Sequence, residues 1–209
     1  MTALVVIAKE PLPGRAKTRL HPPLSLEQAA TLAAAAIDDT LIAMQSVPAA
    51  RRVLLFDGAN SPALAADYEV IPQSDGDLDE RLASIFDHLD GPMLLIGMDT
   101  PQVTRDAVAP AFENWPSDID AWFGPASDGG WWALGMREPR GDLIRGVATS
   151  RDDTGAVQLA RLRSAGLRVG ILPTLTDVDT IDTAREVADA APRGQFAATL
   201  AGFGAEVRA

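Results

Sequence analysis

The sequence contains no cysteine and only two histidines, His21 and His88. It therefore cannot form a disulfide scaffold, a thiolate zinc site, a cysteine nucleophile or a multi-histidine metal centre. Any metal ion would have to be bound by oxygen atoms. The chain has 18 lysine and arginine residues against 29 aspartate and glutamate residues, which gives a formal net charge of −11. This charge argues against broad binding to nucleic acids or anionic membranes, and it favours a small-molecule substrate.

Long hydrophobic runs are also missing. The longest apolar stretches, residues 3–8 and 93–98, have the length of a strand, whereas a membrane-spanning helix needs about 20 apolar residues. The N-terminus passes directly into a strand pattern, without the basic segment, apolar core and cleavage site of an export signal. We therefore expect no transmembrane segment and a cytoplasmic location.

Predicted strands and helices alternate along the chain. Residues 3–8 form a continuous apolar run, which is typical of a central strand covered on both faces. A capping-box pattern at residues 25–28 predicts a helix that extends to about Ser46. Further strands are predicted at residues 52–56, 69–71, 93–97, 120–123, 131–136 and 167–172, and further helices at 61–66, 78–89, 105–114, 154–165 and 180–190.

This order predicts an α/β fold, a three-layer α/β/α sandwich with a mostly parallel central sheet. Residues 1–209 are expected to form a single domain, in which residues 192–209 could be a loosely packed tail. In such a sheet, ligands bind beyond the carboxyl ends of the strands.

The loop at residues 9–20 follows the first strand and concentrates four cations in an acidic chain. Lys9 and Lys17 are the only lysines in the sequence, and the compact ammonium group of lysine suits a phosphate oxygen. Gly14 allows a ligand to approach the backbone closely, and Pro13 stiffens the loop. These features predict a triphosphate-binding loop. The alternative is a solvated basic loop, because the spacing matches neither the P-loop nor the dinucleotide fingerprint.

Carboxylates follow two of the predicted strands. Asp99 lies at the carboxyl end of strand 93–97, and Asp177 and Asp179 follow strand 167–172. In an extended segment the last two side chains would point the same way. Since magnesium and manganese prefer carboxylate oxygens, Asp99 with either Asp177 or Asp179 predicts a two-carboxylate site for Mg²⁺ or Mn²⁺. Helix capping is the alternative role for Asp99 and Asp179.

Two turns add candidate contacts to a substrate. In the turn at residues 128–132 the glycine pair allows backbone amides to face a ligand, and strand alternation places the two tryptophans on opposite faces, one of them free to stack on a base or sugar. Gln73 and Gly76 lie in a polar loop, where an amide side chain and a glycine N–H could read a nucleobase edge. The candidate substrate-binding residues of the first turn are Asp128, Gly129, Gly130 and Trp131.

Together and in this order, five segments resemble the GT-A-type nucleotide-diphospho-sugar transferase superfamily, in particular its small glycosyltransferase-like family. The resemblance covers nearly the whole chain. Its segments are K-x-P-x-P-G-x-x-K-T-R-L at residues 9–20, Q-x-x-x-D-L-x-E-R-L at 73–82, G-M-D-T-P at 97–101, G-P-A-x-D-G-G at 124–130 and D-V-D-T at 177–180.

The resemblance implies that Gly14, Arg15 and Lys17 hold nucleotide phosphates, that Asp99 and Asp179 bind the metal ion, and that Gln73 and Gly76 lie near the base. The K-T-R-L ending also resembles the K-[ST]-R-L of guanylyltransferases that activate phospholactate or phosphoenolpyruvate. The chain departs from the pattern at Asp79, where the family often has glycine, and before Ser150, where it often has an aromatic residue. These departures affect what the resemblance implies about the acceptor side more than what it implies about the nucleotide side.

The sequence thus predicts a metal-dependent transferase that acts on a nucleotide sugar or nucleoside triphosphate and a small-molecule acceptor. Asp99 would hold the metal ion, and Lys17 and Arg15 would neutralise charge on the leaving group. Glycosyl and nucleotidyl transfer both stay open; the alternatives are guanylyltransferase-like activation of a small phosphorylated acid and a non-catalytic nucleotide- or partner-binding module. The predicted nucleotide-binding residues are Lys9, Pro13, Gly14, Arg15, Lys17, Arg19, Gln73 and Gly76.

Overall fold

A seven-stranded sheet forms the centre of the molecule, which we describe for residues 1–204 from a computed structural model. The strands are arranged in the order β3-β2-β1-β4-β6-β5-β7. Strand β6 runs antiparallel to its neighbours β4 and β5, and the other neighbouring pairs are parallel. The strands are β1 (Ala3–Lys9), β2 (Arg51–Asp57), β3 (Glu69–Pro72), β4 (Met93–Gly97), β5 (Ala121–Pro125), β6 (Trp131–Met136) and β7 (Val169–Ile171).

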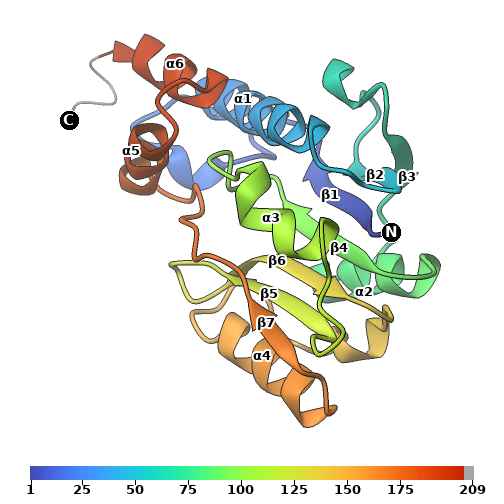
Figure 1. The fold of residues 1–209 in the computed structure, drawn as a ribbon. Helices are drawn as coiled ribbons and strands as arrows, with labels where there is room; N and C mark the ends of the chain where they lie inside the picture. Colours follow the sequence, from blue (N-terminus) through green and yellow to red (C-terminus); the bar gives the residue numbers. More distant parts are fainter. Residues whose placement is uncertain (205–209) are drawn as a thin grey trace.

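Helices cover both faces of this sheet (Figure 1). Helices α1 and α3 contribute to the apolar core on one face, whereas α2 and α4 contribute to the core on the other. The predicted three-layer, mostly parallel α/β/α fold is therefore confirmed. The helices are α1 (Leu26–Gln45), α2 (Leu78–His88), α3 (Arg105–Phe112), α4 (Thr154–Ser164), α5 (Ile181–Ala190) and α6 (Gln195–Gly202), with short 3₁₀ turns at Thr18–Leu20, Ala63–Ala65 and Gly141–Leu143.

The pattern of β1 reflects its place in the middle of the sheet. Leu4 and Val6 pack into the core beneath α1, whereas Val5 packs into the core beneath α2. Both faces are covered, so apolar residues run continuously instead of alternating with polar ones. The capping box that opens α1 is also present, since the Ser25 hydroxyl accepts from the Gln28 N–H and the Gln28 side chain accepts from the Ser25 N–H.

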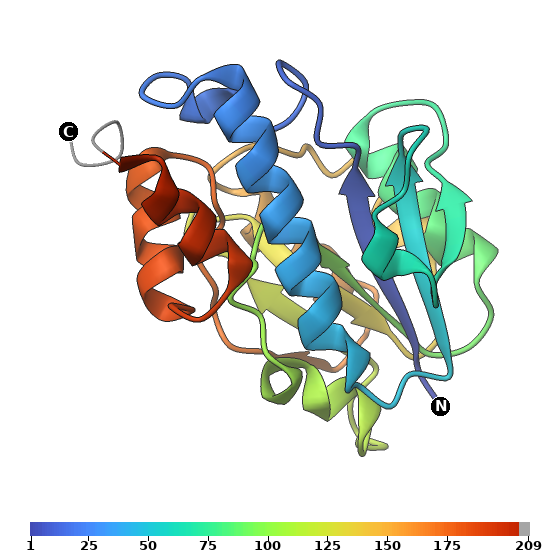
Figure 2. The same cartoon turned by 90° about the horizontal axis from the view of Figure 1, so that it is seen from above.

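The C-terminal segment differs from the sequence prediction. Residues 195–202 form α6, which packs beside α1 and α5 (Figure 2), instead of a loosely packed tail. Phe196 and Leu200 are buried there. The amino end of α6 is capped by Asp39 of α1, whose carboxylate accepts from the N–H groups of Gln195 and Phe196. The signal was missed because the capping side chain is remote in sequence; residues 205–209 of the predicted tail lie outside the described part.

No helix among the described residues is both long and apolar enough to cross a bilayer.

The sheet brings the loops of the candidate site to one edge. Strands β1 and β4 are parallel neighbours, with Ile7 paired to Gly97. The segments that follow both strands therefore leave the sheet side by side. The turn between β5 and β6 opens at the same edge, and the segment after β7 joins it through a bridge between Ala126 and Leu175. This arrangement brings candidate site residues together from four distant parts of the chain.

Candidate functional site

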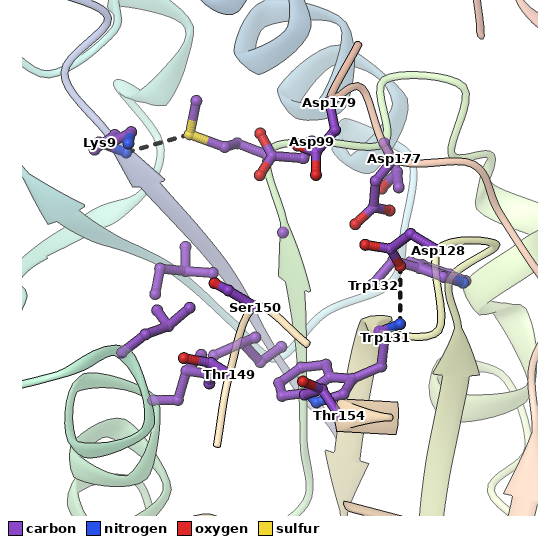
Figure 3. A pocket seen from close by; sticks show the side chains of 18 of the residues that line it. Lys9, Asp99, Asp128, Trp131, Trp132, Thr149, Ser150, Thr154, Asp177 and Asp179 are labelled. Atoms are coloured by element: carbon purple, nitrogen blue, oxygen red, sulfur yellow. Dashed lines mark hydrogen bonds between the residues drawn. The ribbon is translucent and has the colours of Figure 1, made fainter. Parts of the chain in front are cut away.

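A cavity of about 510 Å³ opens at the carboxyl ends of β1 and β4. Its wall is completed by the start of α2, the β5–β6 turn, the loop before α4 and the segment after β7 (Figure 3). A smaller hollow shares five residues with it and also includes Lys17. The predicted site residues that line the main cavity are Lys9, Arg19, Gln73, Asp99, Asp128, Gly130, Trp131, Asp177 and Asp179.

A group of carboxylates forms one end of the cavity, where Asp99, Asp177 and Asp179 lie close together (Figure 3). The ammonium of Lys17 lies between two of them, with Nζ 2.7 Å from Oδ1 of Asp99 and 3.8 Å from Oδ1 of Asp179. Arg19 Nη1 donates to Oδ2 of Asp179 at 3.0 Å. Lys17 also donates to the backbone carbonyl of Val178, and its side chain is only 6% exposed. We call Asp99, Asp177, Asp179 and Lys17 the carboxylate end.

Asp177 has a strongly raised pKa. Burial is the main cause, the negative charges of Asp99 and Asp128 add to it and the positive charge of Lys17 opposes it, so that the pKa of Asp177 is raised to about 7. Its buried Oδ1 has no hydrogen-bond partner within residues 1–204. A buried carboxylate without a partner disfavours its own ionised form, so this group is set to accept an additional cation or donor.

Asp99 and Asp179 do not cap the helices that follow them, which was the alternative role for these carboxylates. The hydroxyl of Thr104 caps α3, and that of Thr180 caps α5. The Asp99 and Asp179 side chains therefore face Lys17 and are not used as helix caps.

The carboxylate oxygens at this end fit a hard cation that completes its coordination shell with oxygen atoms of a bound ligand. Within residues 1–204, no three acidic, histidine or cysteine side chains are positioned to hold a metal ion among themselves. Asp99 and Asp179 nevertheless already share one cation, the Lys17 ammonium. Magnesium is commonly bound by one or two carboxylates together with substrate phosphates, and two oxygen donors plus the unpartnered Asp177 oxygen suit that mode.

The front of the basic loop lies outside the cavity lining. Pro13, Gly14 and Arg15 are exposed, and Arg15 makes only a 4.0 Å ion pair with Asp57. Gly14 has a φ of +74°, a backbone conformation that favours glycine. Contacts from these three residues to a nucleotide stay a prediction.

Gln73 has a positioning role in this structure. Its Nε2 donates to the carbonyls of Ala8 at 2.8 Å and Leu55 at 3.3 Å, and its Oε1 accepts from Nη1 of Arg81 at 3.1 Å. The amide thus ties the segment before α2 to β1 and β2. Gly76, with a φ of +108°, does not line the cavity.

The glycine pair of the β5–β6 turn has a packing function. A Cβ on Gly129 would lie 1.9 Å from the carbonyl oxygen of Asp152, and one on Gly155 would lie 2.4 Å from that of Gly130. The Gly155 N–H donates to the Gly129 carbonyl at 2.8 Å. The glycines therefore allow the turn to pack backbone to backbone against the start of α4, and Asp128 accepts from the Gly130 N–H at 2.8 Å.

The two tryptophans point to opposite faces of the sheet, as predicted. Trp132 is 2% exposed and donates from Nε1 to the Pro173 carbonyl at 2.9 Å. Trp131 packs against the core on the α2 face and lines the cavity. Trp131 is thus the tryptophan available for contact with a ligand.

One wall of the cavity was not among the predicted site residues. It consists of the loop before α4, the first residue of α4 and the side of the α2 start that faces the cavity. The loop residues Thr149 and Ser150 lie opposite the carboxylate end in Figure 3. Two sequence signals lay in this wall: the polar run before a predicted helix, and the end of the segment 73–82 that carries part of the family resemblance. Its residues are Leu78, Arg81, Leu82, Thr149, Ser150, Arg151, Asp152 and Thr154.

The sequence also matches a family model, described as an uncharacterized protein conserved in bacteria (DUF2064), over residues 29–151. This match spans more than half of the chain. The chain belongs to this family. The matched region includes Asp99 and the β5–β6 turn, whereas Lys17 and Asp179 lie outside it. No curated protein matches the sequence.

Three solved structures resemble the chain over most of its length. A provisionally named nucleotide-diphospho-sugar transferase from Desulfovibrio desulfuricans G20 has a TM-score of 0.85 and 25% identity, covering 100% of this chain and 98% of the other. A CMP:2-keto-3-deoxy-manno-octonic acid synthetase in complex with CTP has a TM-score of 0.56 and 10% identity, covering 92% and 99%. A protein from Mycobacterium tuberculosis H37Rv in complex with manganese has a TM-score of 0.51 and 20% identity, covering 90% and 97%. The last two likenesses show the fold alone.

Proposed function

We propose that the protein is a metal-dependent transferase that binds a nucleoside triphosphate or a nucleotide sugar and transfers part of it to a small-molecule acceptor. The observation that carries this proposal is the carboxylate end, where two acids already share a cation at the carboxyl edge of the sheet. Two of the similar structures support a nucleotide ligand: one is named as a nucleotide-diphospho-sugar transferase, and the other is a synthetase in complex with CTP. The manganese complex supports a divalent metal ion.

Asp99 and Asp179 would hold the metal ion, because both carboxylates face the same cation in this structure. Bound there, Mg²⁺ or Mn²⁺ supplies positive charge that stabilises the phosphate oxygens during transfer. Lys17 would exchange its carboxylate partners for a phosphate oxygen and neutralise negative charge on the leaving group. Arg19, which is exposed and paired with Asp179, would do the same from the rim.

Two reaction modes are compatible with this arrangement. In nucleotidyl transfer, an acceptor oxygen forms a bond to the α-phosphorus and the bond to pyrophosphate breaks. In glycosyl transfer, an acceptor hydroxyl bonds to the anomeric carbon and a nucleoside diphosphate leaves. A buried lysine beside the carboxylates favours the first mode, because a pyrophosphate leaving group carries more charge to neutralise.

The test is calorimetric titration with each of the four nucleoside triphosphates and with common nucleotide sugars, with and without magnesium or manganese. We expect one ligand to bind in a metal-dependent manner, and we expect Asp99→Asn to weaken that binding by about 100-fold because it removes a ligand of the metal ion. Asp106→Asn, on α3 away from the cavity, is the matched control and should bind as the wild type does.

The outcome also separates the alternatives. Binding of a triphosphate favours nucleotidyl transfer, and selective binding of GTP favours activation of a phosphorylated acid. Binding of a nucleotide sugar favours glycosyl transfer. If nucleotide binding requires no metal ion and is unchanged in Asp99→Asn, the proposed transferase activity is contradicted. A non-catalytic binding module is then favoured.

A further inference from the structure

Arg81 is a cavity residue whose charge has no counter-ion in the described part of the chain. It projects from the first turns of α2, lines the cavity and donates from Nη1 to Oε1 of Gln73 at 3.1 Å. Among residues 1–204, no carboxylate oxygen lies within the 4.0 Å of an ion pair with Arg81. Its Nε is buried and has no hydrogen-bond partner in the same part of the chain.

The acids closest to Arg81 in sequence are engaged elsewhere. Asp79 accepts from the Gly146 N–H at 2.7 Å, and Glu80 pairs with Nε of Arg145 at 2.9 Å. Both contacts fasten α2 to the segment after β6. The chain has a net charge of −11, so carboxylates are plentiful. Among the described residues Arg81 has none beside it because its acidic neighbours Asp79 and Glu80 bind the segment after β6 instead.

Apolar side chains beside Arg81 suit an organic ligand that carries an anionic group. Leu78 and Leu82, which precede and follow it on α2, line the cavity beside it. Trp131, at the start of β6, lines the cavity and packs against the same apolar core as Leu78. The hydrogen bond that Arg81 donates to Gln73 orients the guanidinium, so the guanidinium loses little freedom when it binds an anion.

We propose that Arg81 binds a carboxylate or phosphate group of the acceptor substrate, whose apolar part lies against Leu78, Leu82 and Trp131. This inference rests on the proposed function, because it names the chemical class of the second substrate. An anion is favoured over a neutral nucleobase because it compensates the full charge of a part-buried guanidinium, whereas a base supplies only dipoles. The nucleotide phosphates belong to the carboxylate end, which the sheet places after β1 and β4.

The experiment follows the Nε–H signal of Arg81 in the full ¹⁵N-labelled chain. The signal is assigned by its loss in Arg81→Lys, and the probes are inorganic phosphate and propionate, each titrated separately. We expect a saturable shift of this signal with at least one probe. We also expect Arg81→Gln to weaken that probe's binding by at least about tenfold, because charge-assisted hydrogen bonds are lost.

Arg105→Gln is the matched control. Arg105 is an arginine of α3 outside the cavity, paired with Glu113 at 2.6 Å, and its loss should leave the probe affinity unchanged. Circular dichroism and thermal unfolding show whether each variant is folded. A shift with phosphate alone identifies a phosphorylated acceptor, and a shift with propionate alone identifies a carboxylic acid. Absence of any shift at Arg81 overturns the proposal.

A second readout separates this inference from the proposed function. Arg81→Gln should leave metal-dependent nucleotide binding unchanged, whereas Asp99→Asn should weaken it by about 100-fold. If Arg81→Gln weakens nucleotide binding as strongly as anion binding, then Arg81 contacts the nucleotide and the assignment to the acceptor is wrong. If the wild-type chain binds anions at Arg81 but no nucleotide, the proposed function fails while the anion site stands.

Discussion

The two ends of the cavity differ in whether their charged side chains are paired. At the carboxylate end, Lys17 lies against Asp99 and Asp179, and Arg19 pairs with Asp179. At the cavity wall formed by the start of α2, which we call the α2 wall, Arg81 has only the neutral amide of Gln73 as a hydrogen-bond partner among the described residues. At the first end the chain's own cations pair with Asp99 and Asp179, whereas the second holds a charge for which the described chain supplies no counter-ion.

This difference separates stability from ligand binding. Substituting Lys17 removes a compensating charge, so it should destabilise the fold, whereas substituting Arg81 removes an uncompensated charge, so it should not. It also implies different ligand responses. The carboxylate end must rearrange its ion pairs when a phosphate and a metal ion bind, while the α2 wall is already oriented for an anion. The predictions below test this contrast, from the largest expected effect to the smallest.

Asp177→Asn should change the pH dependence of stability most. The pKa of Asp177 is about 7 in the folded chain, against 3.8 for the unperturbed group. Between these values the folded state keeps a proton that the unfolded state has lost, so this group's contribution to stability falls as the pH rises towards 7. The variant should therefore be more stable at about pH 8 by up to about 4 kcal/mol, and nearly unchanged below about pH 4.

Urea unfolding of both proteins at about pH 4 and about pH 8 measures this difference. Asp106→Asn, on α3 outside the cavity, controls for removal of a carboxylate. A constant difference between wild type and Asp177→Asn at the two pH values would contradict the burial argument.

Lys17→Met should lower the free energy of unfolding at neutral pH by about 3 kcal/mol, because it leaves neighbouring carboxylates without their shared cation. The pKa of Asp177 should also rise, since Lys17 lowers it in the native chain. Denaturant unfolding measures the loss. In the double variant with Asp99→Asn, part of the loss should be recovered, because one of the unpaired charges is gone. Strict additivity of the two single effects would show that the ion pair contributes nothing.

Arg81→Met should raise the free energy of unfolding by about 1 kcal/mol, because it replaces a part-buried, unpaired guanidinium with an apolar side chain beside Leu78 and Leu82. Thermal and urea unfolding give the value, and Arg81→Lys should show no such gain. A loss of stability similar to that of Lys17→Met would remove the distinction between the two ends of the cavity.

Arg105→Gln should change the free energy of unfolding by no more than about 0.5 kcal/mol, because its pair with Glu113 is half exposed on both sides. The same unfolding measurement provides a scale for the larger effects. A loss comparable to that of Lys17→Met would mean that surface ion pairs contribute more to this fold than burial implies.

Much of the fold followed from local patterns. The buried run at residues 3–8, the capping box at residues 25–28 and the alternation of strands and helices each depend on short-range chemistry, so they predicted the layered sheet correctly. The C-terminal helix α6 was missed because its cap, Asp39, comes from α1, far away in sequence. A local pattern cannot include such a partner.

For the candidate site, the sequence by itself determined which chemistry is available. With no cysteine and two histidines, only oxygen ligands could hold a metal ion, and Asp99 could be placed at a strand end from the apolar run before it. The tertiary structure alone decided which charges meet. It set Lys17 between Asp99 and Asp179, and it left Arg81 without a carboxylate in the described chain. Ion pairing depends on distances across the sheet edge, and those distances arise only when strands remote in sequence become neighbours.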